Sequence, residues 1–380
     1  MEDFYIDYAS MDDIQREYIR RRTDRHMVVT GTAGSGKSVI ALHKLRQVCE
    51  QGSYAIIVYT KSLKKYFVDG IESMKKERLK NFNETLNFRG DRIFYYQEWK
   101  RWYQNHQHEV VDHLIIDECQ DFSAEQIQEM LSFGRICFLF GDAEQTIMDF
   151  GEKVTKNPQA TAESLGVVVD KLYKNYRLTI ETAKVVEKVP RPLINPDISN
   201  ACVRHGEKPR LIKTDSFDSQ LDKIIEIISN GSLTNVGILL RFNTKQTAFS
   251  HSGDAKRSVQ YVKEYFERKG ITVEYKYNIN KDTDMDLDFE SSNPKILTWW
   301  CAKGLQFKDV FVIDCNYDYI EQGETTKEKR TLASAWYVAL SRPSERLFIS
   351  YIDRLANRFP DEFSELYANP INTNESAPIF

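Results

Sequence analysis

Residues 26–45, HMVVTGTAGSGKSVIALHKL, decide the fold of the first part of the chain. The centre of this stretch, residues 31–38, reads G-x-x-x-x-G-K-S between an apolar strand and a helical pattern. Glycines let backbone N–H groups turn inward, and a helix N-terminus adds partial positive charge, so this arrangement surrounds phosphates. We expect Lys37 to reach the terminal phosphates of ATP and the Ser38 hydroxyl to ligate Mg²⁺. The predicted nucleotide-binding residues of the loop are Gly31, Thr32, Ala33, Gly34, Ser35, Gly36, Lys37 and Ser38.

The alternation of apolar β-prone runs with helical patterns predicts an α/β fold with parallel sheets. In the first half, strands are expected at 27–30, 54–60, 113–117 and 136–142, and helices at 38–50 and 123–131, where Ser123 and Gln126 form a capping box. A second series predicts strands at 167–173, 210–214, 236–242, 271–277, 295–300, 310–315 and 346–352, and helices at 179–189, 217–229, 258–269 and 331–341. We therefore predict a domain at 1–155, a second domain at 156–362 and a flexible tail at 363–380.

The composition is that of a globular protein, with 41% apolar and 28% charged residues. No apolar run approaches the ~20 residues needed to cross a bilayer, and the acidic start, MEDFYIDYASMDD, lacks the pattern of a secretory signal. We expect a cytoplasmic protein without a membrane partner. The six cysteines contain no C-x-x-C pair, which favours reduced thiols over disulfides or a zinc site.

The stretch LIIDECQD places two carboxylates directly after a buried strand. Asp117 is the predicted second ligand of Mg²⁺. Glu118 is placed to orient and deprotonate an attacking water. The pair favours hydrolysis over phosphate transfer to a metabolite.

DECQD resembles the D-E-x-Q-D motif of superfamily 1 helicases, the UvrD/Rep group. Further stretches resemble the other motifs of that family in the family's order, from residue 11 to residue 350. They are YTKSL (59–63), GDAEQTI (141–147), LYKNYR (172–177), TWWCAKGLQF (298–307) and YVALSRPSERLFI (337–349).

This resemblance implies two RecA-like P-loop domains with ATP bound in the cleft between them, and movement from 3′ to 5′ along single-stranded DNA. It assigns adenine reading to Gln15, base stacking to Tyr176 and ribose binding to the Gly304–Gln306 stretch, where Gln306 replaces the usual glutamate. The predicted catalytic residues are Lys37, Asp117, Glu118, Gln145, Arg177 and Arg342, of which Gln145 senses the γ-phosphate and Arg342 is the arginine finger.

The resemblance assigns contacts with the DNA backbone to Thr60 and Lys61. Met148 stands where the family often has an aromatic residue that stacks on a base. Without that aromatic ring one step of the DNA track is weaker, and we expect another aromatic side chain to supply a base contact instead. The candidates are Trp99, Phe150, Trp299 and Trp300.

Full-size relatives carry an inserted subdomain in each half, whereas this chain has short connectors. The first spans residues 64–112, and the second is the acidic stretch NKDTDMDLDFESSN at 280–293. The second lacks the glycine and glutamate of a calcium-binding EF-hand loop, because Leu287 and Asn293 occupy those positions. We expect an acidic linker there, and a motor that unwinds duplex poorly without a partner.

Other functions stay open at this stage. The chain could be a DNA-stimulated ATPase that acts as a sensor or regulatory subunit of a partner, for example a nuclease. RNA is a less favoured track than single-stranded DNA, and a small-molecule kinase would leave Arg177 and Arg342 without a role. The sequence does not choose among DNA repair, plasmid maintenance and phage defence.

Overall fold

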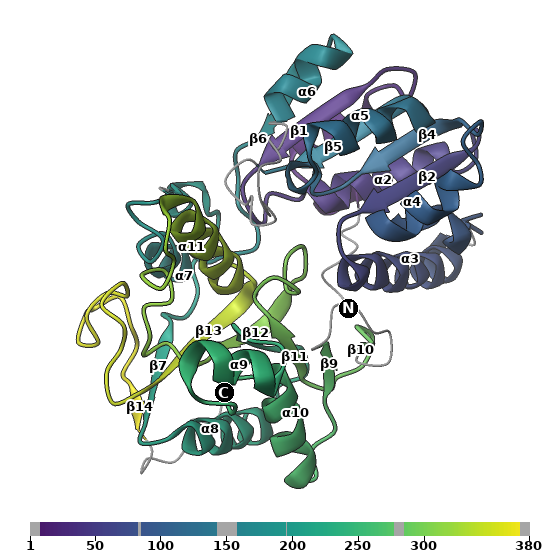
Figure 1. The fold of residues 1–380 in the computed structure, drawn as a ribbon. Helices are drawn as coiled ribbons and strands as arrows, with labels where there is room; N and C mark the ends of the chain where they lie inside the picture. The colour runs from purple at the N-terminus through teal and green to yellow at the C-terminus, as the bar shows by residue number, and fades with distance from the viewer. Residues whose placement is uncertain (1–7, 83–84, 143–157, 195, 277–284, 373–380) are drawn as a thin grey trace. The chain divides into compact units, whose positions relative to one another are not determined.

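The computed structural model describes residues 8–82, 85–142, 158–194, 196–276 and 285–372. The chain divides into two compact units, Met1–Asn175 and Tyr176–Phe380. Each unit is a β-sheet flanked by helices (Figure 1). The predicted α/β fold class is confirmed, whereas the first unit extends beyond the boundary predicted after residue 155.

Unit 1 is built on a six-stranded sheet in which every pair of neighbouring strands is parallel. Its spatial order is β3-β2-β4-β5-β1-β6. The central strands are continuous apolar runs because helices cover both faces of a parallel sheet. The strands are β1 (Met27–Gly31), β2 (Tyr54–Val58), β3 (Ile93–Tyr95), β4 (Val111–Ile116), β5 (Gly134–Gly141) and β6 (Val169–Leu172).

The helices of unit 1 pack through apolar side chains on the sheet. One face is covered by α4, α5 and α6, with Trp99, Ile127 and Ala162 in a common core with Val28 and Leu114. The expected capping box begins α5, since Ser123 accepts a hydrogen bond from Gln126 N. The helices are α1 (Asp13–Arg20), α2 (Lys37–Val48), α3 (Lys61–Phe82), α4 (Tyr96–Gln104), α5 (Ala124–Phe133) and α6 (Pro158–Leu165).

Strand β6 corrects the predicted domain organisation. The sequence pattern predicts the strand at 167–173 as part of the second series, but β6 pairs with β1 in unit 1, with Val28 opposite Val169 and Gly31 opposite Leu172. The apolar pattern of a strand indicates that it is buried and does not specify its neighbour. Unit 1 therefore continues to Asn175.

Unit 2 contains an eight-stranded sheet with the order β10-β9-β11-β8-β12-β13-β7-β14. Among the described pairs, β10 and β9 are antiparallel and the others are parallel. The strands are β7 (Arg210–Thr214), β8 (Val236–Leu240), β9 (Glu274–Lys276), β10 (Met285–Asp286), β11 (Lys295–Thr298), β12 (Phe307–Val312), β13 (Pro343–Ile352) and β14 (Ile371–Asn372).

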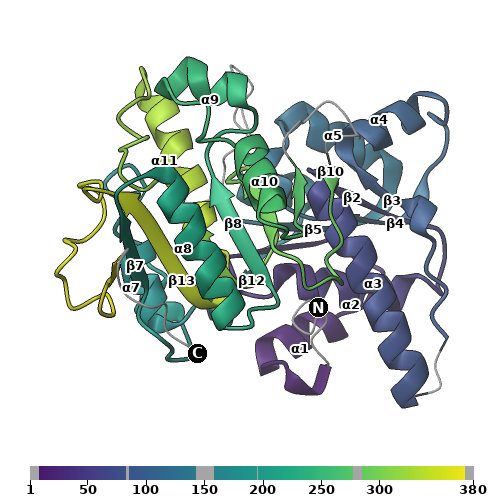
Figure 2. The same cartoon turned by 90° about the horizontal axis from the view of Figure 1, so that it is seen from below.

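Helices α8 and α10 lie over the strands of the unit 2 sheet (Figure 2). Leu221 and Ile224 of α8 and Val262 and Phe266 of α10 share a core with Ile238 of β8. The helices of unit 2 are α7 (Ile180–Val186), α8 (Phe217–Asn230), α9 (Lys245–Ser252), α10 (Val259–Arg268) and α11 (Thr326–Leu340).

The predicted flexible tail is partly ordered. Ile371 and Asn372 form β14 and pair in parallel with Ile212 and Lys213 of β7. Ile371 is buried in the core of unit 2. The sequence NPINTNESAPIF is polar overall, so no local pattern indicates that Ile371 is buried.

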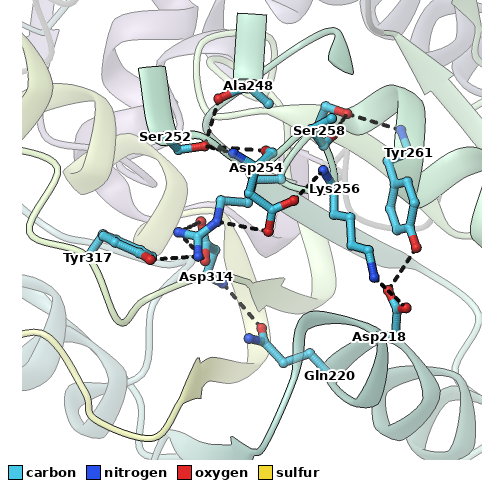
Figure 3. A network of polar contacts seen from close by, with 12 residues as sticks. Asp218, Gln220, Ala248, Ser252, Asp254, Lys256, Ser258, Tyr261, Asp314 and Tyr317 are labelled. Carbon is cyan, nitrogen blue, oxygen red and sulfur yellow. Dashed lines mark hydrogen bonds and ion pairs between the residues drawn. The ribbon is translucent and has the colours of Figure 1, made fainter. Parts of the chain in front are cut away.

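A polar network joins the loop between α9 and α10 to the loop after β12 in unit 2 (Figure 3). The Arg257 guanidinium forms an ion pair with Asp314 at 3.2 Å and donates to the Tyr317 hydroxyl at 2.7 Å. Gln220 Oε1 accepts hydrogen bonds from Asp314 N at 3.3 Å and from Ser350 Oγ at 2.8 Å. Burial raises the pKa of Asp314 to about 7, against the opposing effects of Arg257 and the Tyr319 hydroxyl.

The remaining expectations concern cysteines, metals and membranes. All six cysteines are free. In the part of the chain that the structure describes, no cluster of three His, Cys, Asp or Glu side chains could hold a metal ion. No described helix is long and apolar enough to cross a membrane.

Substitution of Trp99 tests its place in the core. Trp99→Ala should lower the free energy of unfolding of unit 1 by about 3–5 kcal/mol, because it removes a large side chain that has no exposed surface. The measurement is urea-induced unfolding. The exposed Val168→Ala serves as the control and should change that free energy by less than about 0.5 kcal/mol. An equally small effect of Trp99→Ala would contradict the core assignment.

Candidate nucleotide-binding site

The phosphate loop joins the end of β1 to the start of α2, as the motif requires. Gly34 and Gly36 have φ values of 80° and 89°, in the left-handed region that favours glycine. A Cβ on Gly36 would also lie 2.4 Å from Gln15 Nε2. Glycine is therefore favoured at position 36 by its backbone conformation, and a larger residue would also displace the Gln15 amide.

Lys37 lies within the loop that it was predicted to serve. Its Nζ donates to Gly31 O at 2.7 Å and to Thr32 O at 3.0 Å. The side chain is buried, so its charge is held by these carbonyl oxygens. A phosphate oxygen would be a stronger partner for the ammonium group than a neutral carbonyl.

Ser38 and Asp117 are brought together from distant parts of the sequence. Ser38 Oγ, in the first turn of α2, donates to Asp117 Oδ2 at 2.7 Å, just after the end of β4. Asp117 has no exposed surface, and its Oδ1 has no hydrogen-bond partner among the described residues. A hydroxyl oxygen beside a carboxylate with an unpartnered oxygen fits the oxygen ligands that Mg²⁺ prefers. The residues present therefore fit the predicted metal.

The electrostatics of Asp117 support the same conclusion. Burial, and then the negative charge of Glu118, raise the pKa of Asp117 to about 7. The hydrogen bond from Ser38 and the charge of Lys37 oppose this rise. A cation at the carboxylate would favour its ionised form.

Glu118 adopts an uncommon backbone conformation beside Asp117, with φ of 55° and ψ of 43°. Its buried carboxylate accepts a hydrogen bond from Gln120 Nε2. Gln120 Oε1 accepts from Asp142 N at 2.9 Å, directly after β5. Sequence reasoning passed over Gln120, although it lies inside the DECQD motif and orients the predicted base.

Gln15 contacts the phosphate loop. Its Nε2 donates to Ser35 O at 3.1 Å. Its Oε1 accepts from Asp12 N at 3.3 Å, which completes a capping box at the start of α1. Both the oxygen and the nitrogen of the Gln15 amide are hydrogen-bonded within unit 1. Adenine reading by Gln15 stays a prediction, and it would require these hydrogen bonds to be replaced by bonds to the base.

Asn175 is a second residue that sequence reasoning missed. Its buried side chain donates from Nδ2 to Ala33 O in the phosphate loop at 2.8 Å. Asn175 stands in LYKNYR, where the resemblance assigns roles only to Tyr176 and Arg177. No local pattern pairs it with a residue 142 positions away.

Comparison with known proteins bears on this part of the chain. Residues 20–148, about a third of the chain, match the family model described as "AAA domain". This segment is a P-loop NTPase domain. Comparison with curated proteins gives no match.

A solved structure that resembles the chain is the C-terminal domain of a possible DNA helicase from Lactobacillus plantarum WCFS1. Its sequence identity is 18% over 50% of this chain and 96% of that chain, with a TM-score of 0.35.

The site residues predicted in unit 2 lie outside the NTPase domain and gather around Ser341. Arg177 Nε donates to Gln306 Oε1 at 2.9 Å, and Arg177 Nη1 lies 3.4 Å from Ser341 O. Arg342 Nη2 donates to Ser341 Oγ at 2.9 Å. Gly304 nearby has φ of 78°, and Tyr176 is half-buried. Arg177, Gln306 and Arg342 are thus brought together within this unit.

Arg342 is buried, with only 1% of its surface exposed. Its guanidinium also donates to Val338 O at 2.8 Å and to Leu305 O at 3.2 Å, so it joins the end of α11 to the segment before β12. Its role as an arginine finger stays a prediction. Because Arg342 also ties two backbone segments together, lost turnover in an Arg342→Ala variant would not identify a finger by itself.

The predicted contacts with nucleic acid have mixed outcomes. Trp99 as a base contact was wrong, because it is buried and stacks on Tyr103 at a ring distance of 5.0 Å. Trp299 is also buried, whereas Trp300 is half-buried beside it.

The two residues predicted to contact the DNA backbone are both half-buried. The Thr60 hydroxyl caps α3 by accepting a hydrogen bond from Leu63 N, and the Lys61 ammonium lies 5.3 Å from the centroid of the Tyr95 ring. Gln145 and Phe150 lie outside the described residues.

The raised pKa of Asp117 gives a stability prediction for the nucleotide-free protein. The folded carboxyl titrates at about 7, above its ordinary value of 3.8. As pH rises between these values, the unfolded chain ionises first, so Asp117 lowers the stability progressively and keeps it lowered above about pH 7. Asp117→Asn keeps a neutral oxygen for Ser38 and should stabilise the protein more at about pH 8 than at about pH 5.

Chemical denaturation at the two pH values measures this difference. Asp112→Asn is the control. Hydrogen bonds from Ser53 hold the pKa of Asp112 below its ordinary value, so this substitution should lower the stability of the protein instead of raising it. A gain from Asp117→Asn that does not change with pH would contradict the predicted titration.

Proposed function

We propose that the chain is an ATP-hydrolysing motor of superfamily 1, similar to UvrD and Rep, which moves from 3′ to 5′ along single-stranded DNA. The proposed ATPase activity rests on one observation. Ser38 and Asp117 form a hydrogen bond, with Lys37 and Glu118 next to them in the sequence, in a P-loop NTPase domain. The ordered motifs between residues 11 and 350 support the assignment to superfamily 1.

The proposed chemistry is hydrolysis of the terminal phosphate of ATP. A water oxygen attacks the γ-phosphorus, the bond to the β–γ bridging oxygen breaks, and that oxygen leaves with ADP. The Glu118 carboxylate accepts the proton of the water. Lys37 neutralises phosphate charge, and Ser38 and Asp117 would hold Mg²⁺, which supplies further charge neutralisation when bound.

Arg177 and Arg342 supply positive charge for the transition state in this proposal. Such arginines can contribute about 10³–10⁵ to the rate. Both guanidiniums now donate to oxygen atoms of unit 2. Phosphate oxygens are charged acceptors and can replace these neutral ones.

The connectors favour movement along a strand over separation of strands. The described part of residues 64–112 contains the rest of α3, the short strand β3 and α4, all within unit 1. The second connector includes the two-residue strand β10, which pairs with β9. We therefore propose that duplex unwinding requires a partner protein.

Single-stranded DNA should stimulate ATP hydrolysis by the purified chain at a fixed low salt concentration, because phosphate contacts weaken as salt rises. The measurement is phosphate release with DNA, with RNA of the same sequence and without polynucleotide. Stimulation by RNA alone would reject the DNA track. Stimulation by DNA without stepping on strands of graded length would instead identify a sensor or regulatory subunit.

Glu118→Gln should lower ATP turnover by at least about 10²-fold, because an amide cannot accept the proton of the attacking water. Nucleotide affinity should stay within about threefold, since the phosphate loop is unchanged. Turnover is measured by phosphate release and affinity by titration with a fluorescent ADP analogue. The exposed Glu125→Gln is the matched control, and turnover in Glu118→Gln equal to that control would exclude Glu118 as the base.

A further inference from the structure

Donors from four residues hold the backbone carbonyl oxygens of the phosphate loop. Gly31 O and Thr32 O accept from Lys37 Nζ, at 2.7 and 3.0 Å. Ala33 O accepts from Asn175 Nδ2 at 2.8 Å, and Ser35 O accepts from Gln15 Nε2 at 3.1 Å. Ser35 N also donates to Thr32 O at 3.2 Å.

Each of these bonds fixes the orientation of a peptide unit. A trans peptide is planar, and its C=O and its N–H point in opposite directions. A donor that holds Ala33 O therefore directs the N–H of Gly34 to the opposite side. Gln15 does the same for the N–H of Gly36. These N–H groups are the ones that a phosphate-binding loop directs toward its ligand.

Lys37 and Asn175 differ in what a bound phosphate would do to them. The Lys37 ammonium is expected to leave the carbonyls for phosphate oxygens. Asn175 is neutral and fully buried, and its amide holds the loop from the β6 side. Strand β6 runs beside β1, with Leu172 opposite Gly31. The bond from Asn175 can therefore persist in the nucleotide-bound loop.

Strand β6, which leads to Asn175, is held in place by side chains of the α1 segment. Lys171 O accepts a hydrogen bond from the Tyr18 hydroxyl at 3.1 Å, and Asp170 forms an ion pair with Arg21. These contacts tie the strand before Asn175 to α1. Asn175 thus lies three residues after the end of β6, a strand that is held by α1 and paired with the loop's own strand.

We infer that Asn175 is a positioning residue for nucleotide binding, which orients the Ala33–Gly34 peptide so that the Gly34 N–H faces the phosphates. This inference rests on the proposed binding of nucleotide by the phosphate loop, and it adds a residue to that site from outside the loop motif. The alternative role for Asn175 is structural, in which its bond stabilises unit 1 and leaves nucleotide affinity unchanged.

Binding of ADP in the presence of Mg²⁺ distinguishes these roles. Asn175→Ala should weaken ADP binding about tenfold, which is the loss of one net hydrogen bond. The KM for ATP should rise by a similar factor with little change in kcat, because the lost interaction is made in the ground state as well as the transition state. Asn105→Ala, an exposed asparagine in the same unit, is the matched control.

Asn175→Asp gives a signature that a structural role would not produce. The substitution keeps the shape but, when ionised, removes the donor and places a negative oxygen against Ala33 O. Burial raises the pKa of a carboxyl group, and its protonated form can again donate to Ala33 O. The N175D variant should therefore bind ADP more weakly than N175A at about pH 8 and more tightly than N175A at about pH 5.

Thermal unfolding of the nucleotide-free variants provides the structural readout. A lower Tm for Asn175→Ala with ADP affinity within about twofold of the native chain would overturn the inference. The same applies if N175D and N175A show the same affinity at both pH values. A native chain that binds ADP but does not hydrolyse ATP would reject the proposed motor, while the N175A comparison would still decide the role of Asn175. Failure of the native chain to bind ADP would overturn both.

Discussion

The hydrogen bond between Ser38 and Asp117 is the constraint on which the candidate nucleotide site depends. It joins the first turn of α2 to the residue after β4, although β5 separates β4 from β1 in the sheet. Asp117 N donates to Ile57 O of β2, so the backbone of Asp117 still belongs to the sheet. The distance between the phosphate loop and the carboxylate pair is thereby set by the sheet of unit 1.

This constraint has an electrostatic cost that a ligand can relieve. An ionised carboxylate without a partner is unfavourable in a buried site. Asp117 accepts from Ser38 through Oδ2, but its Oδ1 has no hydrogen-bond partner among the described residues, and the adjacent Glu118 adds a second acidic group. A divalent cation would offset both contributions at once. The site therefore combines a fixed geometry with an unfavourable charge distribution, a combination typical of functional sites.

The sequence predicted the parts of the molecule that local patterns encode. Apolar runs marked the buried strands, and the loop motif located Lys37 and Ser38 because its spacing reflects backbone geometry. Long-range partners could not be found in this way. Asn175 contacts Ala33 and β6 joins β1 through sheet pairing, which no local pattern specifies. Trp99 was a different kind of error, since Tyr96, Trp99 and Tyr103 follow the spacing of one buried helix face, a signal that was present.

The short strand β14 has a consequence for the edge of the unit 2 sheet. Its pairing with β7, together with the bond from Ala368 N to Pro209 O at 3.0 Å, satisfies backbone groups along the outer side of β7. An uncovered strand edge is a template for pairing with another chain, and very short edge strands limit this hazard. A chain shortened before residue 371 would expose the backbone of Ile212 and Lys213 and the apolar surface under Ile371. Such a protein would self-associate with increasing concentration, even though its candidate nucleotide site lies in the other unit.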